Sequence, residues 1–151
     1  MPIRVASSTD IPDWIALRAR LWPGTSRAEH RAEVEEWLAG TPDRCIVFVA
    51  VGAERGLLGF AEAALRHDHV NGCETTPVAF LEGIFVRSEM RGTGIGAALV
   101  RSVQAWAIER GCTELASDAA LANRDSHAFH AAMGFAETER VVFFRKRLGE
   151  T

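Results

Sequence analysis

The chain of 151 residues contains no tyrosine and only one lysine, Lys146. A Walker loop ends in Gly-Lys-Ser/Thr, and Lys146 lies outside any glycine-rich stretch, so a P-loop nucleotide site is excluded. The absence of tyrosine excludes a phenol hydroxyl as proton donor in any active site. Whatever chemistry the chain performs must use other groups.

Cysteines, long apolar runs and excess charge are also scarce. Three scattered cysteines, an odd number, do not form a disulfide framework and suit a reducing cytoplasm. The longest apolar run, Cys45 to Val51, is far too short to span a membrane, and no apolar h-region follows Met1-Pro-Ile-Arg4. A net charge of −3 argues against a nucleic-acid partner. We therefore expect a cytoplasmic protein that binds neither membranes nor nucleic acid.

The remaining composition is that of a globular protein, with 48% hydrophobic and 25% charged residues. No repeat, low-complexity tract or linker divides it, so we expect a single domain over residues 1–151. Hydrophobic periodicity and cap residues predict strands at 3–5, 44–51, 57–66, 78–86, 114–117 and 141–147, and helices at 10–21, 26–39, 94–110 and 123–133. This order predicts an α/β fold in which a mixed sheet carries helices on both faces.

The loop between the fourth predicted strand and the third helix is the most informative segment. It reads Arg91-Gly-Thr-Gly-Ile-Gly96 and opens directly into an Ala- and Leu-rich helix. The first N–H groups of a helix have no partners within it, and the helix dipole attracts negative charge there. Glycines let the backbone approach a bulky phosphate. This loop is therefore predicted to bind a pyrophosphate.

Two kinds of site other than a plain structural turn fit the glycine spacing. Gly92-x-Gly94-x-x-Ala97 fits a dinucleotide fingerprint, with Glu114 near the expected acidic position. Against this, five residues separate the strand from Gly92, and too little chain follows for several further βα units. Arg91-x-x-Gly94-x-Gly96 instead resembles the acetyl-coenzyme A loop of the GNAT superfamily of N-acetyltransferases, and the loop favours this assignment.

A second segment extends the resemblance along nearly the whole chain. Asn123-x-x-Ser126-x-x-Phe129-His130-x-x-x-Gly134-Phe135 is similar to the second GNAT signature, Asn-x-x-Ala-x-x-Leu-Tyr-x-x-x-Gly-Phe. Five segments that the fold does not require resemble one branch of the family more specifically, the aminoglycoside 6'-N-acetyltransferases. These segments are 21–24, 66–72, 80–86, 116–118 and 137–140.

The resemblance implies a GNAT fold, in which a mostly antiparallel sheet splays apart after its fourth strand, and acetyl-CoA as co-substrate. The strand before the loop would hold pantetheine by its backbone, and one of its N–H groups would point at the thioester carbonyl. Asn123 would also bond the pantetheine arm, although it can equally be a plain helix cap. The implied acetyl-CoA residues are Ile84, Phe85, Val86, Arg91, Gly92, Thr93, Gly94, Ile95, Gly96, Ala97 and Asn123.

The amine acceptor is expected to meet carboxylates. Glu82 lies on the fourth strand and Asp118 ends the neighbouring one, so both can face one cleft. Acids on apolar strands are rarely buried without a reason. The resemblance makes Asp118 a base or ammonium holder and Glu82 and Glu139 further holders; the alternative for Glu82 and Asp118 is a structural pair with an arginine. Trp22 is either the floor of a sugar site or a core aromatic.

The chain departs from the family where tyrosine is common. His130 and Phe144 stand where many acetyltransferases have the tyrosine that protonates the thiolate, and His69 replaces one in the substrate loop. His130 is a candidate acid, but a packed histidine is favoured, because a thiolate can leave with only a water as donor. His67-Asp-His69 with Cys73 matches no zinc pattern, so no metal is expected.

The expected function is transfer of acetyl from acetyl-CoA to the 6'-amine of a cationic aminoglycoside, by direct attack of the amine, in a protein that forms homodimers. Acetylation of another small polyamine, aminosugar or protein amine remains open. So does a catalytically silent acyl-CoA-binding module, for which the missing tyrosines argue and against which Glu82 and Asp118 argue.

Overall fold

A computed structural model of the chain describes residues 2–54 and 56–149, which form two compact units. The first unit comprises residues 1–118 and the second residues 119–151. None of the helices in the described part is long and apolar enough to span a membrane.

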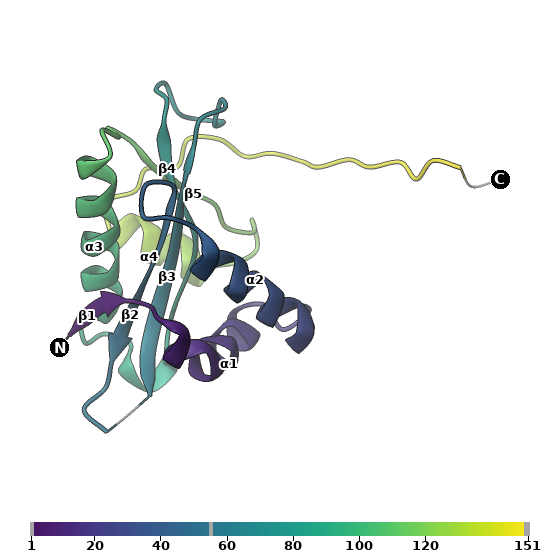
Figure 1. The fold of residues 1–151 in the computed structure, drawn as a ribbon. Helices are drawn as coiled ribbons and strands as arrows, with labels where there is room; N and C mark the ends of the chain where they lie inside the picture. Colours follow the sequence, from purple (N-terminus) through teal and green to yellow (C-terminus); the bar gives the residue numbers. More distant parts are fainter. Residues whose placement is uncertain (1, 55, 150–151) are drawn as a thin grey trace. The chain divides into compact units, whose positions relative to one another are not determined.

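The first unit is built on one five-stranded sheet in the order β1-β2-β3-β4-β5 (Figure 1). The first four strands run antiparallel to their neighbours, and β5 runs parallel to β4. The predicted mixed, mostly antiparallel sheet is therefore confirmed. The strands are β1 (Ile3–Val5), β2 (Cys45–Val51), β3 (Leu57–Arg66), β4 (Val78–Val86) and β5 (Leu115–Ser117).

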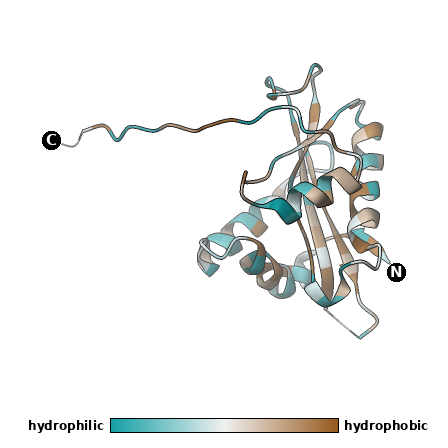
Figure 2. Cartoon of the chain, turned by 180° about the vertical axis from the view of Figure 1, so that it is seen from behind, coloured by the Kyte–Doolittle hydropathy of each residue, from teal (hydrophilic) through white to brown (hydrophobic). Residues whose placement is uncertain are grey.

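Helices cover both faces of this sheet, as the order of elements predicts (Figure 1). On one face lie α1 (Ile11–Leu21) and α2 (Arg27–Ala39), and on the other lies α3 (Ile95–Glu109). Two short 3-10 turns, η1 (Ser8–Asp10) and η2 (Ser88–Met90), precede α1 and the glycine-rich loop. Hydrophobic side chains of α1, α2, β2 and β3 make one continuous core. Figure 2 shows hydrophobic residues along the strands of the sheet.

The helix starts follow the local sequence with one exception. Ser26 caps α2 as predicted, because its side chain accepts a hydrogen bond from the Glu29 N–H at 3.1 Å. Asp10 is the N-cap of α1, but its side chain makes no capping hydrogen bond to the helix. The buried Asp10 carboxylate is instead held by the Arg4 guanidinium at 2.7 and 2.8 Å and by the Ser7 N–H.

The Arg4–Asp10 pair yields a prediction about acid stability. The Arg4 guanidinium lowers the pKa of the Asp10 carboxyl, so this group stabilises the fold above its unfolded pKa, and the contribution is lost as pH falls towards its folded pKa. Asp10→Asn should cost about 1 kcal/mol at pH 7. Urea titrations should show that the difference from wild type shrinks below about pH 4. An equal difference at pH 7 and pH 3 would assign the loss to packing.

The second unit contains α4 (Arg124–Ala132), which Asn123 caps by accepting a hydrogen bond from the Ser126 N–H at 3.1 Å. The strand predicted at 141–147 is not formed: described residues 135–148 lie in neither helix nor strand. Strand backbone needs a partner for its N–H and C=O groups, and none of the described strands pairs with this segment. Its apolar side chains, Phe143 and Phe144 among them, are exposed, and Figure 2 shows the hydrophobic stretch.

Candidate active site

The loop before α3 has the geometry of an anion site. Gly92 and Gly94 adopt φ values of +81° and +91°, which only glycine takes readily, and Gly94 is the N-cap of α3. The first hydrogen bond within the helix runs from the Ala98 N–H to the Gly94 carbonyl at 3.0 Å. The N–H groups of residues 95–97 lie before this bond and are not used in the hydrogen bonding of the helix. Open space surrounds both glycine Cα positions. A phosphate can reach the backbone there.

Arg91 joins this loop to the end of β4. Its Nε donates to the Val86 carbonyl at 3.3 Å, and its guanidinium carbon lies 5.5 Å from the centre of the Phe85 ring. The side chain is exposed, so a cation stands beside the open helix terminus. The residues that the sequence groups as a pyrophosphate site are thus adjacent in the structure.

Beside the loop, one edge of β4 has no strand partner among the described residues. The parallel ladder ends at the Leu81–Ser117 pair, so β5 does not accompany residues 82–86 of β4. On the other edge, Ile84, Phe85 and Val86 remain paired with β3. An open strand edge can accept an extended ligand through backbone hydrogen bonds, which is the predicted pantetheine position.

Glu82 occupies a β-bulge at the point where the sheet opens. Glu62 of β3 pairs with Gly83, and the next residue, Ala63, pairs with Leu81, so Glu82 is the extra residue on β4. Bulges bend a strand and redirect a side chain, and they are frequent beside active sites. The local sequence signal for this bulge is Gly83, because an isolated glycine within a strand often marks a bulge.

The Glu82 carboxylate is not alone. Arg66 donates to it through Nη2 at 2.8 and 3.0 Å and through Nε at 3.2 Å, and the guanidinium stacks 3.6 Å from the centre of the Phe80 ring. The arginine partner considered from the sequence is therefore present. Both side chains of this pair keep contact with solvent, so a cationic ligand can compete with Arg66 for the carboxylate.

Asp118 and Glu82 lie at neighbouring positions of two adjacent strands. Leu81 of β4 and Ser117 of the parallel strand β5 are register partners. Glu82 directly follows Leu81, and Asp118 directly follows Ser117. The Ser117 hydroxyl donates to the Leu81 carbonyl at 3.2 Å and joins the strand ends. The two acids thus occupy equivalent positions on adjacent strands, Glu82 within β4 and Asp118 just after the end of β5, with Asp118 exposed and Glu82 half-buried.

A cavity of about 420 Å³ lies between the helices α1 and α2 and the strands β3 and β4. Of the predicted substrate residues, Trp22 and Glu82 line it, whereas Asp118 and His69 do not. Four further charged or aromatic residues line the cavity and were not predicted from the sequence: Arg18, Glu33, Trp37 and Glu62. The lining consists of Arg18, Trp22, Thr25, Glu33, Trp37, Glu62, Ala64 and Glu82.

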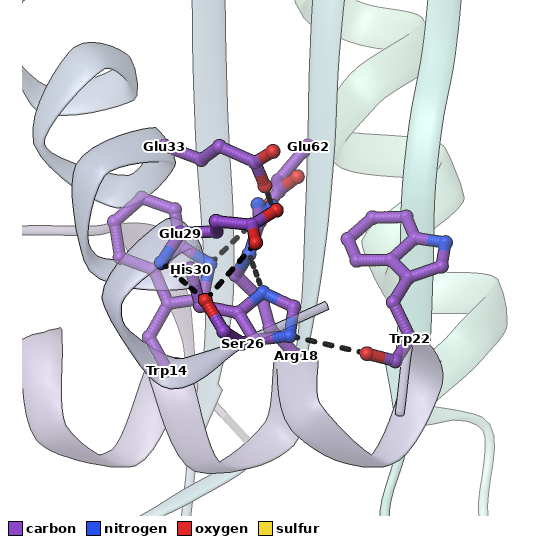
Figure 3. A network of polar contacts seen from close by, with 8 residues as sticks. All are labelled: Trp14, Arg18, Trp22, Ser26, Glu29, His30, Glu33 and Glu62. Carbon is purple, nitrogen blue, oxygen red and sulfur yellow. Dashed lines mark hydrogen bonds and ion pairs between the residues drawn. The ribbon is translucent and has the colours of Figure 1, made fainter. Parts of the chain in front are cut away.

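A buried polar network forms the base of this cavity (Figure 3). The Glu62 carboxylate accepts from Arg18 Nη1 at 2.5 Å and from Trp14 Nε1 at 2.9 Å, and Arg18 Nη2 pairs with Glu33. Arg18 Nε also donates to His30 Nδ1 at 3.2 Å. Since Nδ1 accepts, His30 is the Nε2–H tautomer and donates to the Trp22 carbonyl at 3.2 Å.

Burial raises the pKa of the Glu62 carboxyl, and the Arg18 guanidinium opposes the rise. Removing Arg18 alone would leave a buried carboxylate without its cation, which is costly. The sequence signal for this network is Glu62, the one charged residue between Leu57 and Leu65 of β3.

Trp22 both packs against the core and lines the cavity. Its ring packs 6.5 Å from Phe60 in the core, Arg18 stacks 4.8 Å above it, and it also lines the cavity. A Cβ added to Gly83 would lie 2.3 Å from Trp22 Cη2, so the indole rests directly on the backbone beside Glu82. Glycine at position 83 is required for this contact.

The predicted residues of the second unit can be described only within that unit. Asn123 is the helix cap, and Glu139 is exposed in the segment after α4. His130 Nδ1 lies 2.7 Å from the Ser126 carbonyl, and the ring packs edge-on against Phe129 and Phe135. These contacts agree with the packed histidine that the sequence analysis favours.

The loop containing His69 is held down by Glu114. This carboxylate accepts from the N–H groups of Glu74 and Thr75 and from the Thr75 hydroxyl, which lowers its pKa. The Glu114 carboxylate therefore binds loop residues, whereas in a dinucleotide site it would bind the ribose hydroxyls. The mostly antiparallel sheet also differs from the parallel sheet of a dinucleotide-binding fold. His69 is exposed in this loop, and no group of three or more His, Cys, Asp and Glu side chains among the described residues could hold a metal ion.

An open strand edge, a glycine-rich helix start and an acidic cavity are the features expected of an acyl-CoA-dependent N-acyltransferase. The family described as the acetyltransferase (GNAT) family matches residues 11–135, and the chain belongs to it. Two relatives named aminoglycoside N(6')-acetyltransferase type 1, from Serratia marcescens and Salmonella enteritidis, are 51% and 46% identical over 147 residues, which cover 97% of this chain and 99% of each relative.

Solved structures agree with this assignment. The aminoglycoside 6'-N-acetyltransferase AAC(6')-IG from Acinetobacter haemolyticus superposes with a TM-score of 0.92 at 42% identity, covering 98% of this chain and 99% of that one. AAC(6')-Iy in complex with the bisubstrate analogue CoA-S-monomethyl-acetylneamine gives 0.89 at 44% identity, covering 97% of both chains. The predicted GNAT fold and the resemblance to the aminoglycoside branch are confirmed.

Proposed function

We propose that the protein transfers an acetyl group from acetyl-CoA to the 6'-amine of aminoglycosides. The observation that carries the proposal is the position of the acidic, tryptophan-walled cavity beside the open edge of β4. The similarity to aminoglycoside N(6')-acetyltransferases and to a structure holding a bisubstrate analogue supports it.

The residues present fit acetyl-CoA. The amides of residues 92–97 and the Arg91 guanidinium would hold the pyrophosphate, and the open edge at Ile84, Phe85 and Val86 would hold the pantetheine arm, with Asn123 as a further contact. Bound acetyl-CoA supplies an acetyl thioester to the acceptor amine. A β4 N–H at the open edge would donate to the thioester oxygen as negative charge develops there.

Two carboxylates at the opening of the sheet would prepare the acceptor. An aminoglycoside arrives with protonated amines, and only a neutral amine is nucleophilic. Glu82 would hold the 6'-ammonium in the cavity and Asp118 would take its proton, directly or through a water. Glu139 and His69 would contact the outer part of the sugar. His130 is engaged in packing, so we assign protonation of the thiolate to water.

A thiol-release assay tests the function. The purified protein with acetyl-CoA should release CoA with aminoglycosides that carry a 6'-amine and should be silent with 6'-hydroxyl analogues. Equal rates with both would refute the regiochemistry. No release with either would refute the activity and leave an acyl-CoA-binding module.

We also propose that the protein is a homodimer in the cytoplasm and that its two units belong to one acetyltransferase domain. The family match crosses the boundary at residue 118, and the three cysteines are free thiols, as a reducing compartment requires. Dimerisation would bury the C-terminal apolar segment, whose Phe143 and Phe144 are each 91% exposed. Exposed apolar groups of this size mark interaction surfaces.

The double variant Phe143→Asp/Phe144→Asp should be a monomer at micromolar concentration while the wild type sediments as a dimer. Charged side chains in place of two buried rings would make the interface unfavourable. Sedimentation velocity measures the masses. Thr138→Asp, an exposed polar position in the same segment, is the control and should remain dimeric. Equal masses for wild type and the double variant would refute the proposed interface.

A further inference from the structure

We infer that Glu33 is a specificity-determining residue, which binds a second ammonium group of the acceptor on the wall of the cavity formed by α2. The inference rests on the proposed function, because it assigns a role within the same acceptor site. It concerns amines other than the one that is acetylated.

The charge balance of the cavity gives the first argument. Its lining contains three carboxylates, from Glu33, Glu62 and Glu82, and one guanidinium, from Arg18. Arg18 pairs with both Glu62 and Glu33, so one positive charge faces two negative ones. Glu82 has its own partner, Arg66, outside the lining. Because Arg18 is shared with Glu62, it does not fully compensate the Glu33 carboxylate, which can also bind a cationic ligand.

Burial decides which carboxylate meets the ligand. The side chains of Arg18 and Glu62 are 4% and 2% exposed, whereas that of Glu33 is 47% exposed. Glu62 also accepts from Trp14 Nε1, which leaves it closed off inside the protein. Of the two carboxylates that pair with Arg18, Glu33 is therefore the one accessible to a molecule in the cavity. Arg18, anchored by Glu62 and His30, acts as a positioning residue that holds the Glu33 carboxylate in place.

The surrounding walls suit an aminosugar. Trp37 follows Glu33 by one helical turn, so both project from the same face of α2 into the lining. Trp22 provides a second aromatic wall beside Glu82. Two carboxylates, from Glu33 and Glu82, in one aromatic-walled cavity match a molecule that carries ammonium groups on a rigid, partly apolar ring frame.

The test compares acceptors that differ in their number of amines. With Glu33→Gln, kcat/KM for neamine should fall about tenfold, through KM rather than kcat, because one charge-assisted hydrogen bond is lost at a half-exposed site. For methyl 6-amino-6-deoxyglucoside, which has only the reacting amine, kcat/KM should change less than twofold. Glu33→Asp should restore part of the loss for neamine.

Glu36→Gln is the matched control, since it removes the same charge from an exposed position of the same helix outside the lining. An equal loss for both acceptors, a loss in kcat alone, or the same loss in Glu36→Gln would overturn the assignment. Calorimetric binding of neamine to the CoA-bound protein separates the two proposals. If the wild type binds neamine without acetylating it, a tenfold weaker Glu33→Gln still supports this role while the proposed activity fails. If neamine does not bind, both fail.

Discussion

Gly94→Val is expected to abolish acetyl-CoA binding, with an affinity loss of roughly 100-fold or more, while the protein still folds. Gly94 has φ +91° and sets the direction of the amides that open α3. A β-branched residue strongly disfavours that conformation, so the loop would move and its N–H groups would no longer converge. Calorimetry with acetyl-CoA measures the loss, and thermal unfolding monitors the fold.

Gly111→Val is a closely matched control for this experiment. Gly111 follows α3 at its other end, has φ +82°, and also faces open space, as Gly94 does. Both substitutions should therefore lower stability by a similar amount, about 1–2 kcal/mol or somewhat more. Only Gly94→Val should lose acetyl-CoA. If both variants bind acetyl-CoA like the wild type, the loop is a structural turn.

Glu82→Gln should lower kcat/KM for a 6'-amino aminoglycoside by about 100-fold and leave acetyl-CoA affinity within about twofold of wild type. The amide keeps the size of the side chain but cannot neutralise an ammonium group. The bulge places this side chain at the opening of the sheet, where the amine must approach the thioester. Steady-state rates and acetyl-CoA calorimetry provide the two measurements.

Arg66→Gln distinguishes a functional from a structural Glu82. It breaks the same ion pair but keeps the carboxylate in the cavity. If Glu82 binds the amine, Arg66→Gln should retain most of the activity, since it removes only a competitor for the carboxylate. Equal losses in Glu82→Gln and Arg66→Gln would mean that Glu82 supports the fold through Arg66. That outcome would leave the reacting amine to Asp118.

Much of this architecture could be predicted from local sequence. Periodicity located the first five strands and all four α-helices, because burial on one face of an element repeats at the period of that element. The glycine-rich loop can also be predicted from the sequence. Its conformation depends on neighbouring residues alone, as the positive φ values of Gly92 and Gly94 and the helix start at Ile95 show. The segment at 141–147 has the composition of a strand, but a strand also requires a partner, which its own sequence does not supply.

The acceptor site was determined by contacts between residues far apart in the chain. Arg18 reaches Glu62 across 44 residues, and Arg66 reaches Glu82 across 16. The bulge at Glu82 depends on the register of β3 against β4, and the place of Trp22 depends on an open backbone at Gly83. Local propensity determines helices, caps and turns through short-range sterics and hydrogen bonds. Which charges share a cavity, and which of them remain accessible to a ligand, depends on how the helices pack on the sheet.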